Sequence, residues 1–290
     1  MVSKTALKEK SMALKLTALF ILLIGNLAAR SIETVHFEST DHQTTLVGYL
    51  FEPEGGGRHP AIVMLHGRAG AYSSLANGVY TSATLSKRHK QWGEFWAERG
   101  YLALLVDSFG PRGYAGGFPV GSYKDRPAAV SEQTVRPLDA YGALSYLRGR
   151  RDVVADRIGL QGWSNGAMTT LVTMGEHALE MEQATPETGF RAALAEYPGC
   201  GMDAVKEDYK PYAHLLLTVG TADEEVSATV CETFAKRAKQ RGADLEVVVF
   251  EGAEHNYDDP SKKKRSNPAD EKATAETMRR AEQLFGKYLQ

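Results

Sequence analysis

The feature that most constrains this chain is an alternation of short apolar runs and helical segments from residue 60 to the end. The first run, Ala61–Leu65, is continuously apolar, which is typical of a strand buried on both faces of a sheet. This alternation predicts an α/β fold with a mostly parallel sheet and helices on both faces. The predicted strands span 61–65, 101–106, 157–161, 192–197, 214–220 and 245–250, and the predicted helices span 92–99, 135–148, 167–181, 227–240 and 270–288.

Two earlier segments, 32–37 and 45–51, alternate polar and apolar side chains as strands with one solvated face do. We therefore expect an antiparallel hairpin at one edge of the sheet. The chain has 290 residues, of which 43% are hydrophobic, and this is enough for a substantial core. A single domain over residues 30–290 accounts for all the predicted elements.

Residues Gly162–Gly166 read Gly-Trp-Ser-Asn-Gly and lie between a predicted strand and a predicted helix. In that setting a G-x-S-x-G sequence forms a nucleophile elbow, whose strained turn exposes the serine hydroxyl at the top of the sheet. Both glycines are needed because a Cβ at either position would collide with the adjacent strand or helix. The alternative is a helix-capping serine between two glycines, so partner residues elsewhere must decide.

Ligands of an open parallel sheet bind beyond the carboxyl ends of its strands. Asp223 and His255 follow the last two predicted strands, so the chain order is serine, acid, histidine, as in α/β-hydrolases. We predict a catalytic triad in which His255 takes the proton of Ser164 and Asp223 orients the imidazole. Glu224 and Glu225 are alternatives for the acid, and a capping role is the alternative for Asp223.

A tetrahedral intermediate of acyl transfer needs two N–H donors at its oxyanion. We predict the backbone N–H groups of Asn165, at the start of the helix after the elbow, and of Arg68, in the glycine-bearing loop after the first buried strand. Arg112 is predicted to bind an anionic substrate group, and the alternative is a salt bridge with a loop carboxylate. The predicted substrate contacts are Phe109, Arg112, Trp163 and Tyr257.

The N-terminus is organised like a secretory signal peptide, with lysines before an apolar run over residues 16–23 and the small residues Ala28 and Ala29 after it. We expect cleavage near residue 29, export to the periplasm or the medium, and no stable membrane span afterwards. An uncleaved anchor is the alternative. The formal net charge of −2 argues against a nucleic-acid partner.

The chain has two cysteines, Cys200 and Cys231, and both lie in the part expected to be exported. In an oxidising compartment they can pair, and closing the loop would contribute about 3 to 4 kcal/mol to stability. Two separate buried thiols are the alternative. The histidine and cysteine spacings do not suggest a metal site.

These features resemble the dienelactone hydrolase family of α/β-hydrolases over most of the chain from about residue 32. The resemblance implies that fold, no cofactor, and hydrolysis of a small-molecule ester or lactone. The founding members have cysteine where this chain has Ser164, so the sequence resembles an exported, esterase-like branch. The residues that carry the similarity are the elbow, His66-Gly67, Asp107–Gly113, Tyr197–Cys200, Asp223 and Gly252–His255.

We therefore expect a serine hydrolase that cleaves a carboxylic ester or lactone through an acyl-enzyme intermediate. A peptidase or amidase on the same fold is one alternative. A binding protein that retains the triad with little turnover is another. The acyl preference and the oligomeric state stay open.

Overall fold

The computed structural model describes residues 32–176, 184–205 and 208–290. The predicted signal peptide and its cleavage position lie outside these residues. Residues from Ile32 to Gln290 group as one compact unit. In the described ranges, no helix combines the length and the apolar character needed to cross a membrane.

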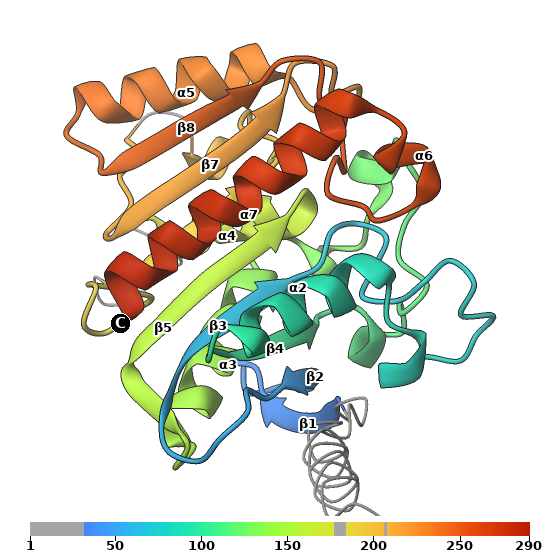
Figure 1. Ribbon diagram of the computed structural model, residues 1–290, viewed down its shortest axis with the longest axis vertical. Coiled ribbons are helices and arrows are strands. Elements are labelled where there is room, and N and C mark those ends of the chain that lie inside the picture. Colours follow the sequence, from blue (N-terminus) through green and yellow to red (C-terminus); the bar gives the residue numbers. More distant parts are fainter. Residues whose placement is uncertain (1–31, 177–183, 206–207) are drawn as a thin grey trace, which may run out of the picture. The chain divides into compact units, whose positions relative to one another are not determined.

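An eight-stranded sheet in the order β1-β2-β4-β3-β5-β6-β7-β8 forms the centre of this unit (Figure 1). All neighbouring strands from β4 to β8 are parallel, whereas β1 pairs antiparallel with β2 and β2 antiparallel with β4. The predicted edge hairpin and mostly parallel sheet are therefore confirmed. The strands are β1 (Glu33–Glu38), β2 (Thr45–Phe51), β3 (His59–Leu65), β4 (Leu102–Asp107), β5 (Val153–Trp163), β6 (Ala192–Glu196), β7 (His214–Gly220) and β8 (Leu245–Phe250).

Helices cover both faces of the sheet, with α2 and α7 on one face and α3 and α4 on the other (Figure 1). The α-helices are α2 (Lys87–Glu98), α3 (Arg136–Gly149), α4 (Asn165–Met174), α5 (Ala228–Gln240), α6 (Lys262–Arg265) and α7 (Pro268–Leu289). Short 3₁₀ helices span Ser82–Thr84, Gly110–Arg112, Ser122–Asp125, Ala128–Val130 and Asp203–Val205.

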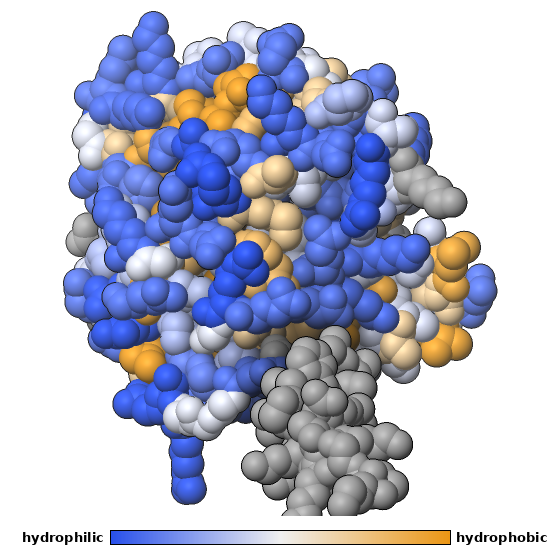
Figure 2. Space-filling model, in the orientation of Figure 1, coloured by the Kyte–Doolittle hydropathy of each residue, from blue (hydrophilic) through white to orange (hydrophobic). Residues whose placement is uncertain are grey.

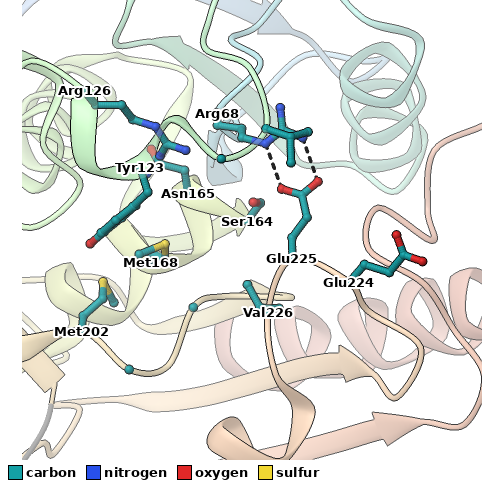
Figure 3. A pocket seen from close by; sticks show the side chains of 14 residues that line it. Arg68, Tyr123, Arg126, Ser164, Asn165, Met168, Met202, Glu224, Glu225 and Val226 are labelled. Carbon is teal, nitrogen blue, oxygen red and sulfur yellow. Dashed lines mark hydrogen bonds and ion pairs between the residues drawn. The ribbon is translucent and has the colours of Figure 1, made fainter.

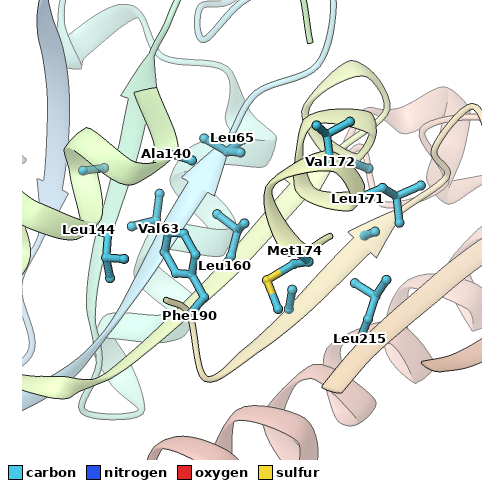
Figure 4. Close-up of a cluster of buried hydrophobic side chains, with 14 of the residues drawn as sticks. Val63, Leu65, Ala140, Leu144, Leu160, Leu171, Val172, Met174, Phe190 and Leu215 are labelled. Carbon is cyan, nitrogen blue, oxygen red and sulfur yellow. The ribbon is translucent and has the colours of Figure 1, made fainter. Parts of the chain in front are cut away.

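Two hydrophobic clusters, one on each face of the sheet, hold these layers together. Along β3, Val63 and Leu65 belong to the cluster under α3 and α4, whereas Ile62 and Met64 belong to the cluster under α2 and α7. Figure 4 shows the first cluster, where Val63 and Leu65 face side chains of α3 and α4. Because successive side chains of a strand point to opposite faces, a continuous apolar run is what a doubly covered strand requires.

Helix α2 begins five residues earlier than the predicted start at Trp92. The side chain of Ser86 accepts a hydrogen bond from the His89 N–H and so caps the helix. The first turn reads Lys-Arg-His-Lys. Because these residues are polar, the hydrophobic pattern did not indicate that the helix begins there. Yet His89 is buried, and its Nδ1 lies 2.9 Å from the Ala71 carbonyl oxygen.

The face of the molecule in Figure 2 is mostly hydrophilic, but apolar side chains gather on the projecting loop between β3 and α2. Leu75 is 80% exposed and Val79 is 56% exposed. Leu75 also lines a cavity that reaches Ser164. Leu75 therefore lies at the rim of the site described next.

Candidate active site

Ser164 sits at the turn between β5 and α4 in a conformation that side chains rarely adopt, with φ 52° and ψ −113°. A Cβ on Gly162 would overlap the carbonyl oxygen of Gly166, at the start of α4. A Cβ on Gly166 would overlap the carbonyl oxygen of Leu65, at the end of β3. The steric reason predicted for the two glycines is therefore confirmed.

Three side chains from different strand ends meet at this turn. The Oγ of Ser164, after β5, lies 3.0 Å from Nε2 of His255, after β8. On the other side of the ring, Nδ1 lies 2.7 Å from Oδ2 of Asp223, after β7. Because a carboxylate can only accept, Nδ1 carries the ring proton and the neutral ring leaves Nε2 free to accept from the serine hydroxyl.

Asp223 makes the hydrogen bonds that belong to both of the roles considered for it. Its second oxygen, Oδ1, accepts hydrogen bonds from the N–H groups of Glu225 at 2.8 Å and Val226 at 2.9 Å, so it caps its own loop. Its side chain is fully buried, while that of His255 is 6% exposed. Asp223 rather than Glu224 or Glu225 thus bonds Nδ1 of His255, although Glu225 Oε2 approaches the other nitrogen, Nε2, to 3.8 Å.

A set of buried polar side chains, which the sequence analysis did not identify, lies beneath the His255 ring. The ring of Tyr197 packs edge-on against the imidazole with 4.9 Å between ring centres, and its backbone has a φ of 43°. The Tyr197 hydroxyl donates to Asp258 at 2.5 Å, and Asp258 also accepts from the Trp92 indole at 2.8 Å and pairs with Arg88 at 3.3 Å. No motif marks Asp258, which is recognised only once β6, α2 and the loop after β8 are seen together.

The two predicted oxyanion donors lie in segments that border Ser164. Asn165 is the first residue of α4, and the N–H groups of a first helical turn have no acceptor within the helix. The loop after β3 passes directly against the elbow, because a Cβ built on Gly67 would lie 3.4 Å from the Ser164 Cβ. Arg68 is the next residue in that loop, so its main chain borders the same position.

The Arg68 guanidinium is bound to the protein itself. Its Nε donates to Glu225 at 2.9 Å and its Nη2 donates to the same carboxylate at 2.7 Å (Figure 3). Its Nη1 donates to the Phe118 carbonyl at 3.2 Å. The hydrogen bonds from Arg68 lower the pKa of the Glu225 carboxyl. This ion pair therefore persists at neutral pH and links the loops after β3 and β7 beside Ser164.

Two cavities meet at Ser164 and Arg68. The first, of about 450 Å³, lies on the Asn165 side, and Figure 3 shows Tyr123, Arg126 and Met168 on that side of the serine. The second, of about 510 Å³, lies on the His255 side and runs below the loop between β3 and α2. A reacting group at Ser164 would therefore have room in two directions.

Three of the four predicted substrate contacts are wrong, because their side chains are buried in the core beneath the site. Phe109 packs on the His66 ring at 4.5 Å, and Trp163 packs against Trp92. The Tyr257 hydroxyl lies 2.8 Å from Thr218 Oγ1. A position near a strand end brings a residue close to the site, but the direction of its side chain is decided by the local backbone, which the sequence pattern did not specify.

The fourth predicted contact, Arg112, takes the alternative that was considered for it. Its guanidinium donates to both oxygens of Asp139, at 2.8 and 2.9 Å, and lies 3.3 Å from Asp41. The side chain is 8% exposed and does not line either cavity at Ser164. The prediction that Arg112 binds substrate is therefore wrong.

Besides Arg68, a second arginine, Arg126, lines the cavity on the Asn165 side. It is partly buried, lies over the rings of Tyr123 at 5.4 Å and Phe118 at 6.0 Å, and donates to Ser122 Oγ at 3.3 Å. Burial lowers its pKa. No sequence pattern marks Arg126, because it lies in a glycine-rich segment without periodicity.

The structure joins Cys200 and Cys231 in a disulfide, as predicted. The bond links the loop after β6 to α5, and two neighbours of Cys200, Gly199 and Gly201, line the cavity on the Asn165 side. Within the part of the chain that the structure describes, no group of three or more His, Cys, Asp or Glu side chains is placed to hold a metal ion.

Comparisons with known proteins agree with this fold. Residues 46–289 match the dienelactone hydrolase family. A curated relative from Bradyrhizobium sp., named "Probable 2-oxo-3-(5-oxofuran-2-ylidene)propanoate lactonase", is 24% identical over 237 residues, which cover 78% of this chain and 85% of the relative.

Two solved structures share the fold. A dienelactone hydrolase-like promiscuous phosphotriesterase from metagenomic libraries superimposes with a TM-score of 0.63 at 19% identity, covering 90% of this chain and 99% of that one. A propionate-bound esterase of Thermogutta terrifontis gives 0.58 at 21% identity, covering 88% and 94%. The family match spans most of the sequence and both structural matches span most of the fold, so this chain belongs to the dienelactone hydrolase family of ester and lactone hydrolases.

Proposed function

We propose that the protein is a serine hydrolase that cleaves a carboxylic ester or lactone through an acyl-enzyme intermediate. The observation that carries the proposal is the 3.0 Å approach of Ser164 Oγ to Nε2 of His255, whose Nδ1 is held by Asp223 at 2.7 Å. A serine hydroxyl is a weak nucleophile on its own, and an adjacent imidazole activates it near neutral pH.

The reaction would follow in two halves. Ser164 Oγ attacks the carbonyl carbon while His255 Nε2 takes its proton, and the resulting oxyanion accepts hydrogen bonds from the N–H groups of Asn165 and Arg68. The tetrahedral intermediate collapses as His255 gives the proton to the departing alkoxide oxygen. Water then attacks the acyl-serine with His255 again as base, which releases the acid and restores the serine hydroxyl.

The two cavities suggest where the two parts of the substrate lie. Because His255 must protonate the leaving oxygen, the alcohol part would occupy the cavity on the His255 side, lined by both His255 and Ser164. The acyl part would then occupy the cavity on the Asn165 side, which we call the acyl cavity, between Met168 and Val226, with Arg126 in its wall. A guanidinium there favours an acyl group that bears a carboxylate.

Export remains part of the proposal. It is supported by the signal-like N-terminal sequence and by the Cys200–Cys231 disulfide, since disulfides persist in oxidising compartments. Fractionation of the native host, with the mature N-terminus read by mass spectrometry, would test it. An intact N-terminus in the cytosolic fraction would contradict it.

The decisive experiment measures hydrolysis of p-nitrophenyl acetate and butyrate by the wild type and by Ser164→Ala. We expect the variant to lose about 10⁴-fold or more in kcat. A fluorophosphonate should label the wild type at Ser164 and leave the variant unlabelled. Faster turnover of aminoacyl p-nitroanilides than of esters would favour an amidase, and the absence of both labelling and turnover would favour a binding protein.

A further inference from the structure

Arg136, the first residue of α3, is fully buried beneath the elbow. Removing a guanidinium from water costs several kcal/mol unless its N–H groups find good acceptors. Two of them do: Nη1 donates to the side-chain Oδ1 of Asn165, and Nη2 donates to the His66 carbonyl at 2.8 Å. Its Nε has no hydrogen-bond partner among the residues that the structure describes, although the group lies 5.0 Å from the centre of the Phe109 ring.

The two acceptors belong to the two segments that supply the proposed oxyanion donors. Asn165 carries one of the donor N–H groups in its own main chain. The His66 carbonyl belongs to the peptide that leads through Gly67 to Arg68, which carries the other. Since a guanidinium is a rigid planar fork, one side chain spans both segments and fixes the distance between them.

The Asn165 side chain has no remaining freedom in this arrangement. Its Nδ2 donates to Glu132 Oε2 at 2.9 Å, while its Oδ1 faces the Arg136 cation. Exchanging the two amide atoms would place a donor against a cation and an acceptor against a carboxylate, so only the observed orientation fits. Glu132 in turn accepts from the hydroxyl of Tyr123 at 2.8 Å, which connects Asn165 to the wall of the acyl cavity.

Stability alone does not account for a cation at this position. Replacing a buried charged network by apolar side chains of similar volume is often neutral or stabilising. Burial lowers the Arg136 pKa to about 10, so the side chain stays charged at neutral pH. A positive charge directly behind the two donors would lower the energy of a developing oxyanion without touching the substrate.

We propose that Arg136 is a positioning residue of the oxyanion hole, holding the main chains of Asn165 and Arg68 at the spacing that the tetrahedral intermediate requires. The inference rests on the proposed serine hydrolase function. Since the oxyanion forms only in the transition state, Arg136 should act on kcat and leave KM nearly unchanged.

The test compares Arg136→Met and Arg136→Lys with the wild type on p-nitrophenyl butyrate, and measures Ki for an alkyl trifluoromethyl ketone, which adds to Ser164 as an oxyanion-bearing hemiketal. We expect Arg136→Met to lower kcat about 100-fold, the effect of losing one oxyanion donor, and to raise Ki by a similar factor. Arg136→Lys keeps the charge but reaches one acceptor, so kcat should fall about 10-fold. KM should stay within about threefold of the wild type, as expected when only transition-state interactions are lost.

Arg112→Met is the matched control. Arg112 is another buried arginine near α3, but it binds Asp139 and Asp41 instead of the two oxyanion segments. That variant should lower Tm and leave kcat and Ki as in the wild type. If Arg136→Met behaves in the same way, Arg136 is purely structural and the proposal is wrong.

A partly unfolded sample contains less active enzyme, which lowers the apparent kcat but changes neither KM nor Ki. A raised Ki therefore cannot result from partial unfolding. If Arg136→Met fails to fold, the Ki of Arg136→Lys decides, and an unchanged Ki overturns the proposal. An inactive wild type, or an active Ser164→Ala, would instead remove the proposed function itself. An active wild type and an inactive Ser164→Ala together with unchanged Arg136 variants would remove only the present inference.

Discussion

Two regions meet at Ser164, and they are held in different ways. The triad and its supports lie at strand ends, where Asp223 is fully buried and His255 is 6% exposed. The wall of the acyl cavity is built from connecting loops, in which Val120 is 66% exposed and Tyr123 is 45% exposed. The first region is fixed by the sheet and by buried hydrogen bonds, whereas the second includes loop side chains that are exposed to solvent.

This difference separates chemistry from selectivity. A displaced triad residue loses a hydrogen bond that the reaction needs, so substitutions there should change rates by orders of magnitude. A changed side chain in the exposed wall alters only the preference for one acyl group over another. Such a preference corresponds to about one or two kcal/mol in transition-state free energy. A triad variant with a small effect on the rate, or a wall variant with a large effect, would therefore contradict this distinction.

The largest effect is expected for Asp223→Asn. An amide at this position donates a hydrogen bond where a carboxylate accepts, so the imidazole would present the wrong tautomer to Ser164. We expect kcat for p-nitrophenyl butyrate to fall about 10⁴-fold, measured by initial rates. Tm should change little, because the side chain keeps its shape.

Glu224→Gln is the matched control for this prediction. Glu224 neighbours Asp223 and lines the acyl cavity, but the acid on Nδ1 of His255 is Asp223. Its kcat should remain within about threefold of the wild type, since it changes no group that contacts the reacting atoms. A loss comparable to that of Asp223→Asn would show that the acid has been misassigned.

The second prediction concerns the disulfide, which fastens the wall near Gly199 to α5. Replacing both cysteines by alanine opens a loop with a sequence separation of 31 residues. The chain-entropy relation gives a loss of about 4 kcal/mol in the free energy of unfolding, measurable by urea denaturation. Because the triad residues follow other strands than the disulfide loop does, kcat at 25 °C should change by less than about threefold.

Reduction of the wild type by dithiothreitol provides the control, and it should reproduce the stability loss of the double variant. If the variant instead keeps its stability and loses kcat, the wall and the triad are not separate regions. An unchanged value for both quantities would show that the bond contributes nothing in solution.

The sequence predicted the first region far better than the second, for a physical reason. Strand-end residues such as Ser164, Asp223 and His255 are located by hydrophobic periodicity and a motif, and the parallel sheet then brings them together. The wall depends on loops without periodicity. For this reason the sequence pattern points to Arg112, which follows a predicted strand, among the four expected substrate contacts, and does not point to Arg126.

Side-chain direction was a second limit. In the sequence, Phe109 and Trp163 lie at the ends of strands that form the site, but both side chains are buried in the core. The buried charges Arg136 and Asp258 were also missed, because an isolated charged residue in a helix or a loop normally reads as solvent-exposed. Only the assembled layers show that Arg136 lies beneath the elbow and that Asp258 holds Tyr197, whose ring packs on the imidazole.

The smallest effect is expected for Arg126→Ala. Its guanidinium lies 5.4 Å from the centre of the Tyr123 ring, and both residues line the acyl cavity (Figure 3). A charge-assisted hydrogen bond to a carboxylate contributes about 1.5 to 3 kcal/mol when buried, and the lower end applies to a partly exposed group. We therefore expect kcat/KM for p-nitrophenyl hemisuccinate to fall about tenfold relative to p-nitrophenyl butyrate.

The ratio of the two substrates makes this prediction specific, because a general loss of activity cancels. Arg126→Lys should restore part of the preference for the acidic ester, since it keeps the charge but not the planar fork. Arg112→Ala should leave the ratio unchanged, because Arg112 is bound to Asp139 away from the cavity. A ratio that moves with Arg112 and stays constant with Arg126 would reverse the assignment of the two guanidinium groups, and it would mean that the acyl group reaches past the exposed wall toward the buried region.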